Sequence, residues 1–231
     1  MVKFQAGLKA QAVIFDFDGV IVDTEPLHYR AFQQILEPLG LGFTWLQYVE
    51  KYMGFDDRDA FNEAFKANGR TLEQSDLNRL IATKAEIFQI VIQDGITAYP
   101  GVVELIRALH SAKVPLAICS GALHSDINPI LGKLGITDCF DIIVTADDVS
   151  RSKPDPESYQ LAFDKLRVHR PHAGLEACET IAIEDTPAGI CSASQAGLQV
   201  VAVTNSYDRE HLNKANCIVD SLEQLLLFES E

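Results

Sequence analysis

The sequence predicts an α/β protein in which a parallel β-sheet is covered by helices and an all-helical domain is inserted after the first strand. From residue 98 onward, short apolar runs alternate with helical patterns, which is typical of a parallel sheet whose strands are joined by helices. Residues 24–97, in contrast, contain helical patterns and no convincing strand. The length of 231 residues, with 47% hydrophobic and 23% charged residues, is enough for a large core.

The expected strands are short and apolar. They cover residues 12–17, 115–120, 142–146, 180–184 and 199–204, with a weaker one at 217–219. Two stripes at helical spacing should face the sheet, namely Val102, Leu105, Ile106 and Leu109, and Ile127, Ile130, Leu131 and Leu134. Residues 222–231 are expected to form a terminal helix.

The insert consists of four helix-like segments, at residues 27–36, 45–53, 57–67 and 73–92. We expect them to form a helical cap domain, residues 24–97, on a catalytic core made of residues 1–23 and 98–231. The chain would enter this domain near residues 23–26 and leave it near residues 94–100, where Gly95 and Gly101 suit a hinge.

The charge excludes several partners. With 19 Lys and Arg against 33 Asp and Glu, the net charge is −14, which would repel a nucleic-acid backbone or an anionic membrane surface. Five cysteines without a CxxC pair favour neither a zinc site nor a disulfide framework. No secretory signal and no run near the roughly 18 apolar residues of a membrane span is visible. A protein of the cytoplasm is therefore expected, and we take a monomer as the default.

Three of the expected strands end in groups that can perform chemistry. The first ends in Asp16-Phe17-Asp18-Gly19, the second in Ser120-Gly121, and another in Glu184-Asp185. Each could be an ordinary turn or helix cap. Because ligands of open parallel sheets bind at the carboxyl ends of the strands, however, these groups should converge in one crevice. Two carboxylates buried near each other need a cation or a substrate to compensate them.

In their order along the chain, four motifs resemble those of the haloacid dehalogenase-like hydrolases. They are Asp-x-Asp-Gly-Val at residues 16–20, the strand-ending Ser120, Lys153-Pro154 and Glu184-Asp185. The resemblance spans nearly the whole chain and implies a Rossmann-like core. The helical insert between the first two motifs resembles the β-phosphoglucomutase and sugar-phosphate phosphatase branch in particular.

The resemblance implies a role for each motif. Asp16 would attack phosphorus and form an aspartyl-phosphate, while Asp18 would act as general acid and then as general base. Lys153 would hold Asp16 and a phosphoryl oxygen, and Ser120 and Gly121 would donate hydrogen bonds to the other phosphoryl oxygens.

The resemblance also implies an Mg²⁺ cofactor, since an all-oxygen site suits this ion. Its ligands would be Asp16, the backbone carbonyl of Asp18, and Asp185, with Glu184 binding directly or through water. Because the dehalogenases that this chain resembles lack an acid at the position of Asp18, phosphate-ester chemistry is favoured.

The sequence therefore predicts an Mg²⁺-dependent phosphatase acting on a small phosphorylated metabolite, a sugar or polyol phosphate. A β-phosphoglucomutase-like mutase is the alternative, because His28, Arg58 and Lys84 resemble substrate-binding residues of that branch. Arg58, however, lies four residues after Gly54, where the mutase pattern has three, and two extra acids, at residues 56–57, lie where a second phosphate would need cations. A phosphate-sensing or partner-binding protein without turnover is a third possibility.

Overall fold

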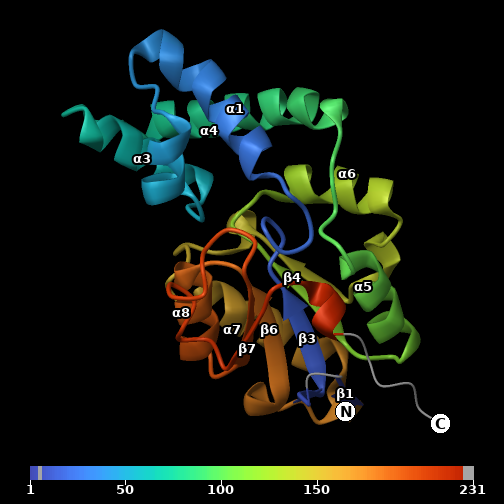
Figure 1. Cartoon of the computed structure of the whole chain (residues 1–231). Helices are drawn as coiled ribbons and strands as arrows, with labels where there is room; N and C mark the ends of the chain where they lie inside the picture. Colours follow the sequence, from blue (N-terminus) through green and yellow to red (C-terminus); the bar gives the residue numbers. More distant parts are fainter. Residues whose placement is uncertain (5–6, 226–231) are drawn as a thin grey trace.

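The centre of the molecule is a six-stranded parallel sheet, with the strand order β5-β4-β3-β6-β7-β8 (Figure 1). The computed structural model describes residues 1–4 and 7–225. In chain order the strands of this sheet are β3 (Ala12–Phe15), β4 (Leu116–Cys119), β5 (Ile142–Val144), β6 (Thr180–Glu184), β7 (Gln199–Val203) and β8 (Cys217–Val219). Strand β3 pairs with β4 on one side and with β6 on the other, so the residues that follow it lie at the middle of the carboxyl edge. The predicted α/β class is confirmed.

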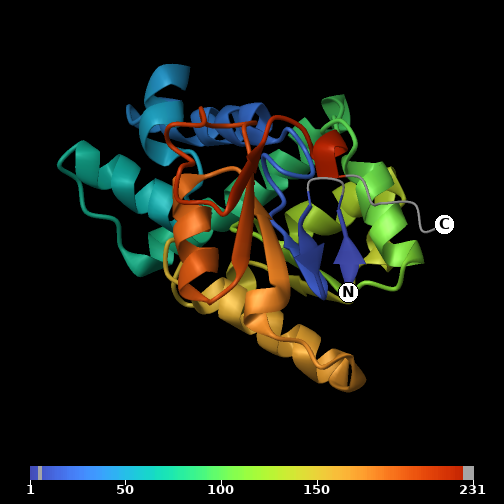
Figure 2. The ribbon, with the colours of Figure 1, turned by 60° about the horizontal axis from the view of Figure 1, so that its bottom comes forward.

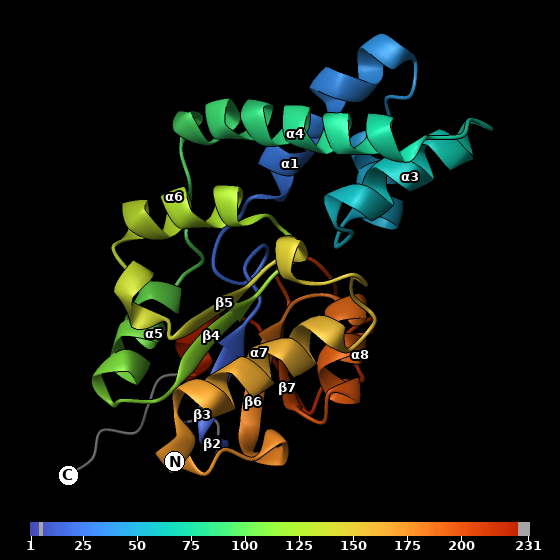
Figure 3. The same ribbon diagram turned by 180° about the vertical axis from the view of Figure 1, so that it is seen from behind.

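Helices cover both faces of the sheet because successive strand residues point to opposite sides. Val13 and Phe15 of β3 pack with α5 (Val102–Ser111) and α6 (His124–Leu134). Ala12 and Ile14 pack with α7 (Glu157–His169) and α8 (Pro187–Gln195) on the other face. Figure 3 shows these two pairs of helices on either side of the strands. The stripe predicted on residues 102–109 faces the sheet, and its four apolar side chains are fully buried.

Above the carboxyl edge of the sheet lies a group of helices, which we call the helical layer (residues 25–94; Figure 1). Its α-helices are α1 (Glu25–Leu36), α2 (Trp45–Gln47), α3 (Asp57–Ala67) and α4 (Gln74–Val91). The layer has an apolar core of its own, which includes Phe32, Leu36, Tyr48 and Phe61. Burial of such side chains contributes about 1.5–3 kcal/mol each, so the layer has its own source of stability.

Two chain segments connect the layer to the sheet, and they pair with each other. Val22 and Ala98 form an antiparallel bridge. The N–H of Asp23 donates to the carbonyl of Thr97 at 3.0 Å, and that of Tyr99 to Ile21 at 3.1 Å. Side chains also meet between the helical layer and the rest of the chain, for example Lys84 of α4 and Asp126 of α6. The division of the chain into two domains therefore stays a prediction.

Local structure differs from the sequence prediction at several points. Strands β1 (Val2–Lys3) and β2 (Lys9–Ala10) form an antiparallel pair that was not predicted, since two residues are too short for a readable pattern. In Figure 2 this pair and the turn Leu222–Leu225 lie beside α5, and both contribute to the same apolar cluster. Residues 226–231 of the expected terminal helix lie outside the described residues.

The strand expected at residues 142–146 ends at Val144, because the Thr145 hydroxyl accepts the Asp147 N–H and starts a 3₁₀ turn (Ala146–Asp148). The helix expected at residues 45–53 is divided into the short α2 and a π-helical turn, Tyr48–Tyr52. Within residues 1–4 and 7–225, no helix is long and apolar enough to cross a lipid bilayer.

Candidate active site

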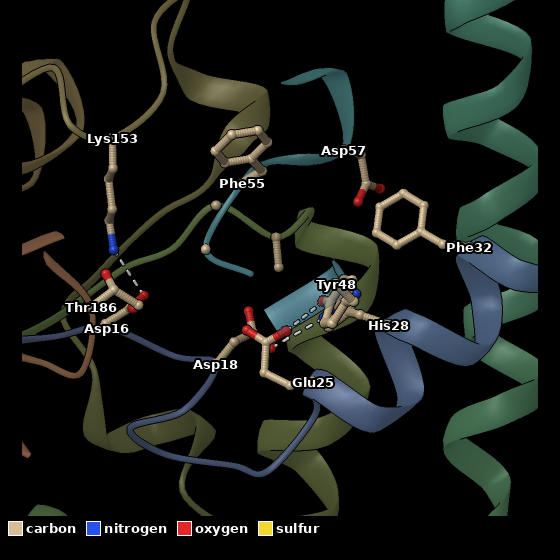
Figure 4. Close-up of a pocket in the computed structure, with 13 residues that line it drawn as sticks. Asp16, Asp18, Glu25, His28, Phe32, Tyr48, Phe55, Asp57, Lys153 and Thr186 are labelled. Atoms are coloured by element: carbon tan, nitrogen blue, oxygen red, sulfur yellow. Dashed lines mark hydrogen bonds and ion pairs between the residues drawn. The ribbon is translucent and has the colours of Figure 1, made fainter. Parts of the chain in front are cut away.

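A small pocket lies between the carboxyl edge of the sheet and the helical layer (Figure 4). Its volume is about 40 Å³. The sheet side contributes Asp16, Asp18, Gly121, Ala122, Lys153 and Thr186, and the helical layer contributes Glu25, His28, Phe32, Tyr48, Gly54, Phe55 and Asp57. Most of the polar side chains that the motifs predicted for a site are therefore at or directly beneath this pocket.

Asp16, Lys153 and Glu184 form a buried charge cluster at the end of β3 and β6. The Lys153 ammonium lies 2.9 Å from Asp16 Oδ1 and 2.7 Å from Glu184 Oε1, and it also donates to the Cys119 carbonyl at 3.1 Å. Burial and the charge of Glu184 raise the pKa of Asp16 to about 8, although Lys153 opposes the rise. Burial lowers the pKa of Lys153, but the two carboxylates outweigh it and the pKa lies well above its usual value. One lysine therefore does not neutralise the acids of this cluster.

Asp185 provides the strongest indication of a cation site. Its Oδ1 atom is buried and has no hydrogen-bond partner, while Oδ2 accepts a hydrogen bond from the Ser206 hydroxyl. Carboxylate oxygens of Asp16, Glu184 and Asp185 lie within 4.8 Å of one another. Burial first, and then the charges of Asp16 and Glu184, raise the pKa of Asp185 well above its usual value. An unpartnered oxygen in an acidic cluster with one lysine fits a hard divalent cation.

Both carboxylate oxygens of Glu184 accept hydrogen bonds. Its Oε1 accepts from Lys153 and from the Tyr159 hydroxyl at 2.7 Å, and Oε2 accepts the N–H of Asp185 at 3.2 Å and the hydroxyl of Thr186 at 3.2 Å. A Cβ on Gly189 would come within 1.9 Å of this carboxylate, so the position of Glu184 requires a glycine there. These contacts fix the position of the Glu184 carboxylate, which in turn holds the Lys153 ammonium.

Gly19 has a similar function beside Asp185. Its φ of +78° is a conformation that favours glycine, and a Cβ there would lie 1.9 Å from Asp185 Oδ2. The Asn205 amide donates to the Gly19 carbonyl at 2.7 Å. The glycine of the first motif thus lets the chain turn closely over the acidic cluster.

Asp18 lies across the pocket from Lys153 and is bound mainly from α1 and the residue before it. The Thr24 hydroxyl donates to Asp18 Oδ1, and His28 Nε2 lies 3.2 Å from the same oxygen. Burial opposes ionisation, but His28 and Thr24 outweigh it, so the pKa of Asp18 lies below its usual value. Asp18 is therefore held in its ionised form.

His28 joins Asp18 to Lys84 of the helical layer. Lys84 Nζ lies 2.7 Å from His28 Nδ1 and 2.9 Å from Asp57 Oδ1. Since an ammonium has only donors, Nδ1 accepts, and the ring proton belongs on Nε2, where it faces Asp18. Stacking on Phe88, with ring centroids 4.3 Å apart, fixes the imidazole plane.

The remaining predicted residues differ in how near they lie to the pocket. Ser120 is buried beneath it; its hydroxyl accepts the Ala122 N–H at 2.9 Å and donates to Asp18 Oδ2 at 3.4 Å, whereas Gly121 lines the pocket. Lys84 is fully buried behind Asp57 and does not line the pocket. Arg58 points away, because its guanidinium pairs with Asp56 at 2.9 Å and lies in a neighbouring hollow. The structure therefore does not bring Lys84 or Arg58 to the position of a direct substrate ligand.

Sequence reasoning did not single out Glu25, Tyr48 and Asp57, which line the pocket, or Thr24, whose hydroxyl donates to Asp18 beside it. Thr24 and Glu25 directly precede His28, in the segment from which substrate contacts were expected. Tyr48 belongs to the π-helical turn, which has no simple sequence signal. Asp57 could have been found, because it is one of the two extra acids after Gly54.

The pocket is lined by residues that follow three neighbouring parallel strands, namely Asp16 and Asp18 after β3, Gly121 after β4 and Thr186 after β6. A pocket at this edge is typical of α/β enzymes, whose ligands bind at the carboxyl ends of the strands. Residues 13–203 match the model of the haloacid dehalogenase-like hydrolase family, and the chain belongs to this family. The resemblance read from the four motifs is therefore confirmed.

The curated relatives and solved structures agree with this assignment. Hexitol phosphatase A of Escherichia coli strain K12 is 30% identical over 94% of both chains. The phosphorylated carbohydrates phosphatase of Thermotoga maritima is 29% identical over 82% of both. A β-phosphoglucomutase from Clostridium difficile is 28% identical, with a TM-score of 0.82 over 94% of this chain and 93% of that one.

Proposed function

We propose that this protein is an Mg²⁺-dependent phosphatase that hydrolyses a small phosphorylated metabolite, a sugar or polyol phosphate, through an aspartyl-phosphate. The observation that carries the proposal is the contact of 2.9 Å between Asp16 and the buried Lys153, beside an acidic cluster with an unpartnered oxygen. Relatives named hexitol phosphatase and phosphorylated carbohydrates phosphatase support this substrate class.

In the first half-reaction, an oxygen of Asp16 forms a bond to phosphorus while the bond from phosphorus to the ester oxygen breaks. Lys153 orients Asp16 through its contact with Oδ1 and offers positive charge to the phosphoryl oxygens. Asp18 gives a proton to the departing alkoxide. For this purpose Asp18 must be protonated when substrate binds, which the negative phosphoryl group favours.

In the second half-reaction, water attacks phosphorus and releases Asp16 as a carboxylate together with inorganic phosphate. Asp18 takes the proton from this water. The hydrogen bonds from Thr24 and His28 keep the Asp18 carboxylate oriented for this step and stabilise its ionised form. The same residue thus serves both halves of the reaction with opposite proton transfers.

The cation would be held by Asp16, Asp185 and the Asp18 carbonyl. Glu184 would contribute through a bound water, because both of its oxygens already accept hydrogen bonds. When bound, Mg²⁺ supplies positive charge for the phosphoryl oxygens. The fit rests on the orphaned Oδ1 of Asp185 and the excess of carboxylates.

We also propose that the helical layer is a cap domain, residues 24–97, that opens to admit substrate. The pocket of about 40 Å³ has room for only a few water molecules, whereas pockets for small ligands have about 300 Å³ or more. Movement about the paired connections at residues 21–23 and 97–99 would enlarge it, and closure would exclude bulk water.

A phosphate-release assay over a panel of metabolite phosphates, with and without EDTA, tests the proposal. We expect Mg²⁺-dependent release from at least one sugar or polyol phosphate. The Asp16→Asn variant should be folded and inactive, because an amide cannot act as the nucleophile. Hydrolysis by Asp16→Asn at the wild-type rate would contradict the role of Asp16, and absence of release across the panel would contradict the function.

A phosphomutase is the second candidate, since the structural likeness to a β-phosphoglucomutase extends over 94% of this chain. It would use the same Asp16 but transfer the phosphoryl group to a sugar hydroxyl. Incubation with β-glucose 1-phosphate and a bisphosphate primer distinguishes the two functions. Formation of glucose 6-phosphate without stoichiometric free phosphate would support the mutase.

A further inference from the structure

We propose that Asp57, Glu25 and Tyr48 form a subsite for substrate hydroxyl groups, and that this subsite selects monophosphates of uncharged polyhydroxylated molecules and rejects substrates with a second phosphate. The inference rests on the proposed phosphatase function and specifies its substrate. These three residues belong to the helical-layer side of the pocket, and in Figure 4 Asp57 faces the pocket from the side opposite Asp16 and Lys153.

One carboxylate oxygen of Asp57 has a hydrogen-bond partner and the other has none. Oδ1 accepts from Lys84 at 2.9 Å, whereas Oδ2 is buried without a hydrogen-bond partner. The residue is only 9% exposed and lines the pocket. A buried carboxylate oxygen without a donor is costly, so a ligand that supplies an O–H to it is favoured.

Glu25 and Tyr48 extend this hydrogen-bonding surface. The Tyr48 hydroxyl donates to Glu25 Oε2, which leaves the lone pairs of the Tyr48 oxygen for a ligand donor. Both residues line the pocket, and both are nearly buried. Together with Asp57 they offer acceptors, which is the complement of a chain of hydroxyl groups.

The charges of the pocket oppose a second phosphate. Its lining contains the carboxylates Asp16, Asp18, Glu25 and Asp57 against one lysine, Lys153, which already contacts Asp16. The nearest cation to Asp57 is Lys84, which is fully buried behind it and does not line the pocket. A second phosphate would therefore face two carboxylates, Glu25 and Asp57, in surroundings of low dielectric constant.

The start of α3 does not compensate for these carboxylates. Its first N–H groups could bind an anion, but Asp56 Oδ1 accepts the N–H of Asp59 at 2.8 Å and already caps the helix. Arg58, the cation of this segment, is paired with Asp56 outside the pocket. At the start of α3 the pocket is therefore lined by the carboxylate Asp57 and not by the cation Arg58, which favours a ligand that donates hydrogen bonds over an anion.

The test compares three substrates in the full-length protein with Mg²⁺: sorbitol 6-phosphate, sorbitol 1,6-bisphosphate and p-nitrophenyl phosphate, which has no alcohol group. In the wild type, kcat/KM for the monophosphate should exceed that for the bisphosphate by at least about tenfold. Asp57→Asn keeps an oxygen for Lys84 and replaces the free oxygen by an amide donor. In this variant we expect the ratio of kcat/KM for sorbitol 6-phosphate to that for p-nitrophenyl phosphate to fall by about 10- to 100-fold, chiefly through KM.

Asp59→Asn is the matched control, because Asp59 also lies at the start of α3 but contacts Ser152 in the neighbouring hollow. It should leave two ratios of kcat/KM at their wild-type values, that of sorbitol 6-phosphate to the bisphosphate and that of sorbitol 6-phosphate to p-nitrophenyl phosphate. Tyr48→Phe serves as a second probe of the subsite if Asp57→Asn does not fold, and it should lower the same ratio in the same direction.

Equal effects of Asp57→Asn on sorbitol 6-phosphate and p-nitrophenyl phosphate, or efficient wild-type hydrolysis of the bisphosphate, would overturn the subsite while leaving the phosphatase intact. Absence of hydrolysis of all three compounds and of the wider panel would overturn the phosphatase and the subsite together. The two failures are therefore distinguishable by the p-nitrophenyl phosphate reaction.

Discussion

Replacement of Gly189 by alanine tests whether Glu184 must stay where the structure places it. A Cβ at residue 189 would lie 1.9 Å from Glu184 Oε1, whereas real Cβ contacts stay beyond 3.0 Å. The carboxylate would have to move by at least 3.0 − 1.9 = 1.1 Å. It cannot move cheaply, because it is fully buried and accepts hydrogen bonds from Lys153 and Tyr159 at 2.7 Å.

The expected loss of stability follows from two opposing contributions. Removal of Gly from a helix in favour of Ala gains about 1 kcal/mol. Disruption of the buried contact between Glu184 and Lys153 costs about 3–5 kcal/mol. The free energy of unfolding of Gly189→Ala should therefore fall by about 2–4 kcal/mol, which corresponds to roughly 5–15 °C in the unfolding midpoint for a chain of this size.

Gly132→Ala in α6 is the matched control, since a Cβ there would meet nothing within 4 Å. It should gain about 0.5–1 kcal/mol, as expected for an exposed helical glycine. Urea unfolding measures both changes, and phosphate release measures activity. A Gly189→Ala protein with wild-type stability and activity would refute the reasoning, because Glu184 would then be shown to move freely.

Three further predictions concern the cation, the general acid and the pH dependence of stability. Mg²⁺ at 100 times its Kd should stabilise the wild type by about 2.7 kcal/mol in a thermal-shift assay, and Asp185→Asn, which removes a proposed ligand, should lose most of this gain. Thr24→Val removes the hydroxyl that donates to Asp18 and should lower kcat about tenfold with little change in KM; an unchanged kcat would contradict its positioning role. Burial is the largest single effect on Asp148 and opposes its ionisation, but the hydrogen bonds from Lys165 and Thr145 and the charge of Lys165 together outweigh it and lower the pKa. Since a lowered pKa stabilises the fold above the unfolded-state value and this contribution is lost as pH falls through the folded-state pKa, Asp148→Asn should lower stability at pH 7, by up to about 1 kcal/mol because solvent screens the pair, and the loss should disappear on acidification; a cost independent of pH would contradict the assignment.

The fold could be predicted from the sequence because apolar periodicity reflects burial. The alternation of β3, where Val13 and Phe15 face one side of the sheet and Ile14 the other, follows directly from strand geometry. The pair β1–β2 and the π-helical turn at Tyr48–Tyr52 could not be predicted, since so few residues establish no period.

The centre of the site could also be predicted from the sequence, since Asp16 and Glu184 each end an apolar strand and must meet at one edge of a parallel sheet. The pocket residues on the helical-layer side were harder to predict. The direction in which Arg58 and Asp57 point depends on how α3 begins, and adjacent residues of a helix point about 100° apart. Asp57 therefore lines the pocket, whereas Arg58, one residue later, points out of it.

The most direct test of the account is to identify the residue that carries the phosphoryl group. The Asp18→Asn variant lacks both the general acid of the first half-reaction and the base of the second. With p-nitrophenyl phosphate, whose leaving group departs without a proton, it should still be phosphorylated, and phosphorylated protein should accumulate until the reaction is quenched in acid, because the second half-reaction has lost its base. Mass spectrometry of its peptides should locate the phosphoryl group on Asp16. A phosphoryl group on another residue, or none under conditions in which the wild type releases phosphate, would contradict the central claim.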